Sequence, residues 1–266
     1  MNKLGFIGCG KMASAIIKGV LNHTNGNFEI IGSEINEDVA KTASERLGIK
    51  VICDNKILAQ QSDVIILATK PNCVLPVLEE IKPFLNNSKL VISIAAGVTT
   101  EKINTVLENQ RVVRVMPNTP ALLGVGMAGI TGGKFAKNED VEFVKSLLEN
   151  VGKAIIVEEN QMDVITAISG SGPAFFYQVI EDMARAGEKL GLSYEKSLIL
   201  ATQTALGSAK MIENRGETSV QTLIDNVATK GGCTFVGICA MKEENSAKMF
   251  EKVITDTTKK ASELGK

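Results

Sequence analysis

The sequence predicts a doubly wound α/β domain followed by an all-helical domain, and three observations support this. Up to about residue 158, short apolar runs alternate with helical periods, which is typical of a mostly parallel sheet covered by helices on both faces. Beyond about residue 160 the strand signals stop and helical periods fill the chain. The length, 266 residues, is enough to bury a core without disulfide or metal staples. We therefore expect an α/β domain over residues 1–160 and a helical domain over residues 161–266.

The first domain is expected to contain eight strands. The unbroken apolar run from Val64 to Ala68 suits a central parallel strand that is buried on both faces. The helix expected over 37–47 begins after Asn36, a favourable N-cap, and ends before Gly48, a favourable C′ residue. Other helices are expected over 11–22 and 72–82. The expected strands cover residues 3–8, 28–32, 49–52, 64–68, 89–94, 111–116, 126–131 and 153–157.

The second domain is expected to consist of helices alone. Thr218 and Gln221 have the spacing of a capping box that opens one of them. The whole chain has no tryptophan and only two tyrosines, so this domain has little aromatic area with which to build a core by itself. We therefore expect its apolar helices to pack against a second copy of the chain, as a homodimer. The expected helices cover residues 161–190, 194–214, 218–228, 234–244 and 246–263.

Charge and hydropathy argue against two classes of partner. Lysine and arginine total 29 and aspartate and glutamate total 30, so the net charge is −1. Neither domain has the excess of basic residues that nucleic-acid binding requires. No run approaches the ~18 apolar residues of a membrane-spanning helix. The chain enters a strand-like segment at Lys3, which leaves no room for a signal peptide, so we expect a cytoplasmic protein.

The cysteines and the single histidine do not predict a metal site. The cysteines are scattered and form no C-x-x-C pair, whereas zinc needs about four closely spaced nitrogen or sulfur ligands. Those outside the functional site are expected to be small core residues. His23 lies in a polar stretch at a helix end and is expected to be solvated, so we expect no histidine base. The cysteines are Cys9, Cys53, Cys73, Cys233 and Cys239.

A glycine-rich turn follows the first expected strand. The segment from Gly8 to Ala13 has the pattern G-x-G-x-x-A between a strand and a helix. Gly8 permits the tight turn, Gly10 lets a pyrophosphate approach the backbone, and Ala13 lets helix and strand pack closely. The helix N-terminus adds free N–H groups and a positive dipole. We therefore expect a Rossmann-type dinucleotide-binding domain; the alternative is a purely structural turn.

Glu34, at the end of the second expected strand, bears on the choice of nicotinamide cofactor. It lies 24 residues after Gly10, near the ~20 typical of the acidic residue that binds the adenosine ribose. Such a carboxylate repels a 2′-phosphate and so favours NADH. Two alternatives stay open. Ser33, without an adjacent arginine, can donate to the 2′-phosphate of NADPH, and Glu34 can be a solvated residue that begins a helix.

Three further segments are rich in glycine or proline. The second opens a helix at Pro173, a favoured residue in a first helical turn. The third places a Gly-Gly pair before Thr234 and a new helix, so that free N–H groups can bind an anion. Alternatively either loop is only a helix–helix turn, and Thr234 is the N-cap of a helix that begins at Phe235. The segments cover residues 116–121, 169–174 and 230–234.

Taken in order, the motifs resemble the pyrroline-5-carboxylate reductase family over essentially the whole chain. The resemblance implies NAD(P)H-dependent reduction of 1-pyrroline-5-carboxylate to proline, the last step of proline biosynthesis. It also implies an interlocked helical homodimer that can assemble into a larger ring of dimers. It rests on FIGCGKMA at 6–13, ATKP at 68–71, SIAAGV at 93–98, RVMPNTP at 114–120, SGSGPA at 169–174 and GGCT at 231–234.

The resemblance also implies which residues form the site. The Thr234 hydroxyl would be catalytic by orienting the ring nitrogen, and N–H groups near Cys233 would bind the substrate carboxylate. The substrate-binding residues would be Glu159, Asn226, Gly232, Cys233 and Thr234. The cofactor-binding residues would be Gly8, Cys9, Gly10, Lys11, Met12, Ser33, Glu34, Asn55, Thr69, Lys70 and Ala96.

Two of these positions carry alternatives. Lys70 follows the fourth strand, where it either points into the ligand crevice or is a solvated lysine before a helix-starting proline. The family usually has Ser-Pro before the Gly-Gly pair, where this chain has Thr229 and Lys230. The missing proline loosens the loop, and the added charge can help or hinder capture of a carboxylate.

Two other functions compete with the reductase. A hydroxyacid dehydrogenase would need a lysine or another acid–base group on the first helix of the second domain, where the nearest ionisable groups are Glu181 and Asp182. A non-catalytic dinucleotide sensor would keep Gly8 and Gly10 but would not need the GGCT loop. Reduction of a cyclic imine fits the lack of a histidine base, because the imine takes its proton from water and needs mainly positioning.

Overall fold

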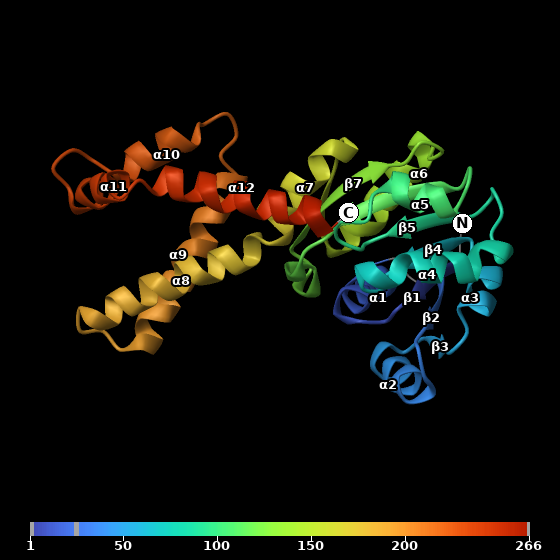
Figure 1. The fold of residues 1–266 in the computed structure, drawn as a ribbon. Helices are drawn as coiled ribbons and strands as arrows, with labels where there is room; N and C mark the ends of the chain where they lie inside the picture. Colours follow the sequence, from blue (N-terminus) through green and yellow to red (C-terminus); the bar gives the residue numbers. More distant parts are fainter. Residues whose placement is uncertain (1–2, 24–26, 265–266) are drawn as a thin grey trace. The chain divides into compact units, whose positions relative to one another are not determined.

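The computed structural model describes residues 3–23 and 27–264, and within them all eight expected strands are present (Figure 1). Each end lies within one residue of its expected place. The expected strand pattern is therefore confirmed. The strands are β1 (Lys3–Ile7), β2 (Glu29–Ser33), β3 (Lys50–Ile52), β4 (Val64–Leu67), β5 (Leu90–Ser93), β6 (Arg111–Met116), β7 (Gly126–Gly132) and β8 (Gly152–Ile156).

The strands form one sheet in the order β3-β2-β1-β4-β5-β6-β7-β8. Neighbouring strands are parallel except β6 and β7, which are antiparallel. The chain begins in the middle at β1, builds outward to β3, and then crosses to β4 on the other side of β1. The strand order reverses between β1 and β4, and ligands of such sheets bind at the carboxyl ends of the strands at this point.

Helices cover both faces of the sheet, as expected for a doubly wound fold. One buried cluster joins the sheet to α1, α2 and α6, and a second joins it to α3, α4 and α5. Strand β4 gives Ile66 to the first cluster and Ile65 to the second, so both of its faces are buried. These helices are α1 (Lys11–His23), α2 (Glu37–Leu47), α3 (Asn55–Gln61), α4 (Pro71–Ile81), α5 (Thr100–Val106) and α6 (Asn138–Leu148).

The ends of α2 confirm the expected caps. The Asn36 side chain accepts a hydrogen bond from the Val39 N–H group at 3.0 Å, and Gly48 ends the helix with φ 68°. The sheet is further connected by short helical segments. These are η1 (Lys82–Phe84), η2 (Thr119–Leu123), η3 (Glu149–Val151), η4 (Glu159–Gln161), α7 (Met162–Ile165) and a π-helix, η5 (Thr166–Gly170).

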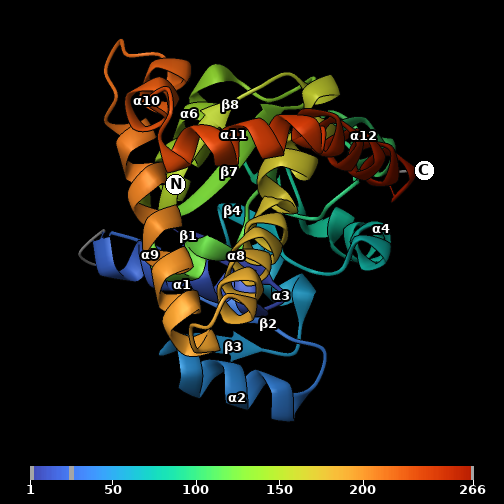
Figure 2. The ribbon, with the colours of Figure 1, turned by 90° about the vertical axis from the view of Figure 1, so that its left-hand side faces the viewer.

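The rest of the chain is helical. Its first two helices, α8 and α9, lie side by side in both ribbon views (Figures 1 and 2). Gly187 allows this approach, because a Cβ atom there would lie 2.6 Å from the Ser197 hydroxyl oxygen. The helices are α8 (Gly172–Lys189), α9 (Tyr194–Glu213), α10 (Val220–Val227), α11 (Cys233–Glu243) and α12 (Ser246–Leu264).

Two expectations for this region are wrong. The single helix expected over 161–190 is interrupted at η5, where the Ser171 N–H group bonds to the Thr166 carbonyl five residues earlier. The capping box expected from Thr218 and Gln221 is absent. Ser219 caps α10 instead, since its hydroxyl lies three residues before the Thr222 N–H group and accepts from it at 3.0 Å. The Gln221 side chain bonds to Asp225 at 2.8 Å.

The chain divides into two compact units. The sheet unit comprises the residues up to Ser171 together with those from Thr255 onward, and the helical unit comprises Gly172–Ile254. This division differs from the boundary expected near residue 160, because the segment from η4 to η5 packs on the sheet. A Cβ atom on Gly129 of β7, for example, would lie 2.6 Å from the Ile165 side chain. Residues 1–2 and 265–266 of the expected domains, including the start of the chain, lie outside the described residues.

Candidate functional site

The glycine turn lies at the point where the strand order reverses. Gly8 has φ 90°, and a Cβ atom there would lie 2.8 Å from the Ala68 carbonyl oxygen. Only glycine fits this position without strain. Gly10 differs, because no atom of the described residues lies within 4 Å of a Cβ atom added to it. Packing within the protein does not require glycine there, whereas a diphosphate lying against the backbone would.

The N-terminus of α1 completes this cradle. Lys11 and Met12 are its first two residues, and its first turn has no acidic side chain. The first amides of a helix have no carbonyl partner within the helix, and they carry the positive end of its dipole. The Ser14 hydroxyl donates to the Gly10 carbonyl at 2.8 Å and so fixes the turn from behind. This end of α1 therefore suits an anionic group.

Thr69 supplies a second observation that fits a ligand at this place. Its hydroxyl oxygen is buried and has no hydrogen-bond partner in the described part of the chain. Its methyl group lies 3.4 Å from the position of a Cβ atom on Gly8, which places Thr69 beside the cradle. An unpaired buried hydroxyl is unfavourable unless a ligand or water satisfies it. The residues present therefore fit a bound dinucleotide.

Lys70 follows β4, which borders the point of reversal, and Ala96 follows β5, the next strand of the sheet. Lys70 is exposed at the N-cap of α4, directly before Pro71, and its side chain makes no capping hydrogen bond. Both interpretations of Lys70 are compatible with this position. Ala96 is half-buried in the loop after β5.

A cavity of about 330 Å³ lies beside the cradle at the end of β2. Within it, the Glu34 carboxylate accepts a hydrogen bond from the Cys9 N–H group at 2.6 Å. From the other side, the Arg46 guanidinium donates to the Cys9 carbonyl at 2.5 Å. The cavity is lined by Cys9, Gly10, Glu34, Asp38, Val39, Thr42, Ala43 and Arg46. Two carboxylates and one guanidinium therefore surround the place where the adenosine ribose of a dinucleotide binds in such folds.

Ser33 and Asn55, which do not line this cavity, form a hydrogen-bonded pair at the end of β2. Ser33 is fully buried, and its hydroxyl donates to the Asn55 side-chain oxygen at 2.7 Å. The Asn55 amide nitrogen in turn donates to Glu80 at 2.9 Å. The Ser33 hydroxyl proton is therefore used inside the protein, which disfavours Ser33 as a donor to a 2′-phosphate.

Glu159, the predicted substrate residue of the sheet unit, belongs to a buried polar cluster. One of its oxygens lies 2.6 Å from Nη1 of Arg114, and the other accepts from the Thr100 hydroxyl at 2.7 Å. Arg114 is 2 % exposed, whereas the Glu159 side chain is 32 % exposed. The carboxylate is thus held from inside and reaches the surface.

The GGCT loop lies in the helical unit and opens α11. Gly231 has φ 85°, and the Gly232 N–H group closes a turn onto the Thr229 carbonyl at 2.9 Å. The helix begins at Cys233, with Gly232 as its N-cap. Thr234 is therefore the second residue of the helix, and its interpretation as the N-cap of a helix from Phe235 is wrong. The first amides of α11, which include those of Cys233 and Thr234, are the ones that lack intrahelical acceptors.

The remaining predicted residues of this unit are on its surface. Asn226 is exposed near the end of α10, and Lys230 is exposed in the loop. The structure thus gathers the predicted cofactor residues and Glu159 in the sheet unit, and Asn226, Gly232, Cys233 and Thr234 in the helical unit. Within the described ranges, no group of three or more histidine, cysteine, aspartate or glutamate side chains could hold a metal ion.

The cysteines only partly follow expectation. Cys9 is buried, and burial together with the nearby Glu34 carboxylate raises the pKa of its thiol to about 12. Cys53 and Cys73 are exposed, so the expectation that they are core residues is wrong. Cys53 follows the edge strand β3, and Cys73 lies in the first turn of α4 on its outer side. His23 ends α1 and is exposed, as expected, with Nδ1 2.9 Å from the Gly19 carbonyl oxygen.

Sequence reasoning missed four residues near the predicted ones. Arg46 lies seven residues after Val39 on α2, and this two-turn spacing could have placed it on the cavity-facing side of the helix. Arg114 interrupts a run of apolar residues in β6, a signal for a buried charge that needs a partner. Thr100 opens α5 and has no comparable signal. Asp38, also missed, is a first-turn residue of α2 that resembles an ordinary helix start.

The acidic groups noted on α8 are engaged in ordinary surface contacts. Glu181 accepts from the Tyr194 hydroxyl at 2.6 Å and from Arg185 at 2.8 Å. These bonds lower the pKa of the Glu181 carboxyl, the hydroxyl bond most. Asp182 bonds to Gln178 at 2.9 Å. Neither group has the character of the acid–base residue that a hydroxyacid dehydrogenase would need.

Two family models match the chain. A family model described as pyrroline-5-carboxylate reductase dimerisation matches residues 159–264, and one described as NADP oxidoreductase, coenzyme F420-dependent, matches residues 3–97. The chain is 40 % identical over 266 residues to a pyrroline-5-carboxylate reductase of Methanosarcina acetivorans, with 99 % of this chain and 98 % of the relative covered.

Solved structures give the same result. That of a pyrroline-5-carboxylate reductase from Coxiella burnetii matches with a TM-score of 0.91 and 36 % identity, covering 99 % of this chain and 98 % of that one. The structure of a Plasmodium falciparum pyrroline carboxylate reductase with NADP bound matches with a TM-score of 0.87 and 33 % identity. The match covers 100 % of this chain and 98 % of that one. The similarity therefore extends through both units.

Proposed function

This chain belongs to the pyrroline-5-carboxylate reductase family, and we propose that it reduces 1-pyrroline-5-carboxylate to proline with a nicotinamide dinucleotide. One observation carries the proposal above all. The relationship spans both units at 40 % identity, and the dinucleotide cradle with its unpaired Thr69 hydroxyl occupies the expected place in the first. The protein is thus an NAD(P)H-dependent oxidoreductase of proline biosynthesis.

The sheet unit would hold the cofactor by its diphosphate. The backbone at Gly10 leaves room for this group, and the first amides of α1 point positive charge at it. Thr69 would satisfy its buried hydroxyl on the bound molecule. When bound, the nicotinamide supplies the hydride that reduces the imine carbon.

The helical unit would hold the substrate. We assign the carboxylate to the N–H groups at the start of α11, where Gly232, Cys233 and Thr234 turn into the helix. The Thr234 hydroxyl would orient the ring nitrogen, a role left available because Thr234 is not the N-cap. Asn226 and Glu159 would complete the contacts to substrate. Correct orientation of two reactants supplies most of the acceleration in such a reaction.

The ribose cavity supports a preference for NADH over NADPH. Glu34 and Asp38 place two carboxylates beside the position of a 2′-phosphate, and the Ser33 hydroxyl is already bonded to Asn55. Arg46 opposes them, but its guanidinium donates to the Cys9 carbonyl. Coulomb repulsion from two carboxylates against one cation therefore disfavours the phosphate.

The helical unit supports a homodimer, in agreement with the dimerisation model that matches it. We extend this to a ring of dimers, on the resemblance described above. A reducing, cytoplasmic location is supported by the five cysteines, all of which are unpaired thiols. None of the helices in residues 3–23 and 27–264 is both long enough and apolar enough to cross a membrane.

Steady-state kinetics with both cofactors tests the proposed function. Oxidation of NADH is expected to require the cyclic imine, to saturate with it, and to yield proline in equal amount. NADPH is expected to support a lower kcat/KM than NADH. Binding of NADH without any imine-dependent oxidation would instead indicate a dinucleotide sensor, and the proposal would be abandoned.

A further inference from the structure

Arg114 lies behind Glu159, the carboxylate that is predicted to bind the substrate, and has no role in the reaction described above. We propose that Arg114 is a positioning residue, which holds Glu159 in the orientation that binds the cationic form of the ring. The proposal rests on the proposed function, in which Glu159 contacts the substrate. The chemical task of Glu159 in this orientation is to attract a protonated imine.

The geometry fixes both oxygens of Glu159. Nη1 of Arg114 lies 2.6 Å from Oε1, and the Thr100 hydroxyl donates to Oε2 at 2.7 Å. Arg114 extends from β6 and is almost fully buried, so water does not compete with Glu159 for its Nη1 group. A carboxylate that is held at both oxygens keeps one orientation, whereas an unrestrained glutamate on the surface would populate several rotamers.

The charges of the cluster leave an excess of negative charge. Nη2 of Arg114 lies 3.7 Å from Asp163, and it has no hydrogen-bond acceptor among the described residues. Glu159 and Asp163 are each about one-third exposed. Two carboxylates therefore share one buried guanidinium, and their exposed edges favour a cation over a neutral molecule or an anion.

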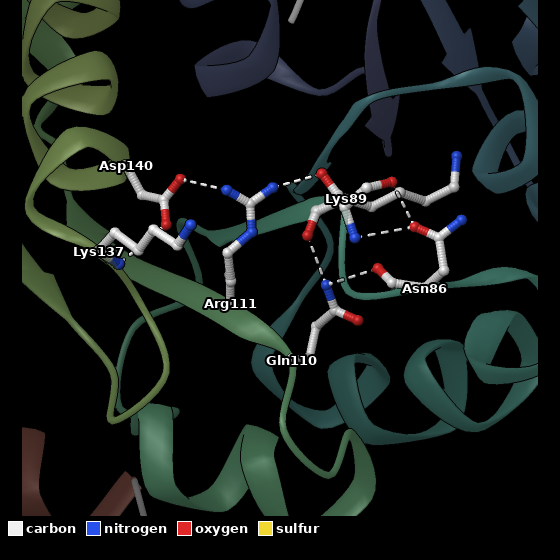
Figure 3. Close-up of polar contacts among 7 residues, drawn as sticks. Asn86, Lys89, Gln110, Arg111, Lys137 and Asp140 are labelled. Carbon is white, nitrogen blue, oxygen red and sulfur yellow. Dashed lines mark hydrogen bonds and ion pairs between the residues drawn. The ribbon is translucent and has the colours of Figure 1, made fainter.

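The same strand carries a matched control at its other end. Nη1 of Arg111 lies 2.7 Å from the Asp140 carboxylate, which is 1 % exposed, and the guanidinium also donates to the Ser88 carbonyl (Figure 3). Around it, Gln110 bonds to carbonyls of neighbouring loop residues. Arg111 thus forms a buried arginine–carboxylate pair that contains no predicted site residue. Breaking either pair is expected to destabilise the fold, because Arg111→Met leaves the buried Asp140 carboxylate unpaired and Arg114→Met removes the guanidinium that neutralises Glu159 and Asp163.

The test compares Arg114→Met with Arg111→Met by kinetics and thermal unfolding. Both variants are expected to lower Tm. Only Arg114→Met is expected to raise KM for the imine, by about tenfold or more, with kcat changed by less than about twofold. A rise in KM without a change in kcat is expected because Glu159 holds the ring nitrogen in the bound substrate and in the transition state alike, so that its misplacement weakens both by the same free energy. The dissociation constant for NADH is expected to stay unchanged.

Two conservative variants keep the proposal testable if Arg114→Met does not fold. Arg114→Lys retains the charge and is expected to give a smaller rise in KM. Thr100→Val removes one hydrogen bond from Glu159 and is expected to raise KM by about threefold to tenfold. If KM for the imine is unchanged in these variants while wild type reduces it, the positioning role is wrong. If wild type does not reduce the imine at all, the proposed function itself has failed.

Discussion

The two compact units of this chain differ in how they bury apolar side chains. In the sheet unit, two clusters cover both faces of the sheet and leave its central strands almost without exposed area. In the helical unit, only Gly172, Ala184, Ser197 and Ala201 are buried. Large apolar side chains there remain on the surface, among them Phe176, Leu190, Ile199 and Val236, which are 67 %, 88 %, 68 % and 66 % exposed.

This difference shows which unit can fold by its own contacts. Soluble proteins rarely leave contiguous apolar patches of this kind exposed, and such patches mark interfaces. The sheet unit therefore has its own core, whereas we infer that the helical unit, within the region that the dimerisation model matches, completes its core with a second copy of the chain. Cofactor binding is expected to depend on the first unit alone, and catalysis on the assembled dimer.

The largest effect is expected from a charge placed on the apolar surface of the helical unit. Ile199→Glu would bury an unpaired carboxylate in the dimer interface, at a cost of roughly 3–5 kcal/mol. We expect mainly monomer in sedimentation at micromolar concentration and a loss of imine reduction of about 100-fold or more. NADH binding is expected to persist.

The matched control is Ile57→Glu. Ile57 is an exposed isoleucine of α3 in the sheet unit, where no partner is expected. This variant is expected to remain dimeric and active. A monomeric Ile199→Glu protein with full activity would show instead that the helical unit is complete without a partner.

The next effect separates substrate binding from cofactor binding. Thr234→Ala is expected to lower kcat/KM for the imine by roughly 10–100-fold, which corresponds to ~1.4–2.7 kcal/mol for one positioned hydrogen bond. The dissociation constant for NADH and Tm are expected to stay near those of wild type, since Thr234 caps no helix. Thr234→Ser retains the hydroxyl and is expected to recover much of the activity. Equal losses of Tm and activity in both variants would indicate a structural role instead.

The complementary change lies in the sheet unit. Glu34→Ser is expected to shift the ratio of the dissociation constants for NADH and NADPH by about tenfold toward NADPH, because a charged acceptor for the ribose and a repulsive carboxylate are both removed. KM for the imine is expected to change little. An unchanged cofactor ratio would mean that Glu34 only holds the Cys9 amide.

The smallest effect concerns the thiols of the two units. Alkylation with iodoacetamide at pH 8 is expected to modify Cys233, which is exposed, and to spare Cys9, whose pKa of about 12 leaves almost no thiolate. An unfolded thiol titrates near ~8.5. Between that pH and about 12 the unfolded chain loses a proton that the folded chain keeps, so Cys9 makes stability fall as pH rises. Peptide mass spectrometry gives the labelled positions, and labelling of Cys9 in the folded protein would contradict this burial.

The sheet unit could be predicted from the sequence almost completely. Its strands are continuous apolar runs and its turns have glycines with clear mechanical tasks, so Gly8 and the caps of α2 follow from local chemistry. The π-helix at η5 and the cap at Ser219 could not be predicted with the same success. The cap depends on which of two neighbouring hydroxyl residues, Thr218 or Ser219, accepts the bond, and the π-helix depends on one extra residue in a single turn. Local patterns decide neither.

The parts of the site that a short run of residues forms with its backbone could be predicted from the sequence. The parts that depend on side chains far apart in the sequence could be predicted less well. The glycine turn and the GGCT loop are read directly from the chain. Arg46 and Arg114 reach their places through a helix face and a strand register, which bring residues far apart in the sequence together. The opposition of Arg46 to Glu34 around the Cys9 peptide could therefore be seen only in three dimensions.

The most direct test of the central claim is to follow the hydride itself. The protein is mixed with NADH that carries deuterium at the transferred position of the nicotinamide, together with 1-pyrroline-5-carboxylate, and the product is examined by mass spectrometry. Proline with a single deuterium at C5, the former imine carbon, is expected in proportion to the NADH consumed. Consumption of NADH without deuterated proline would contradict it.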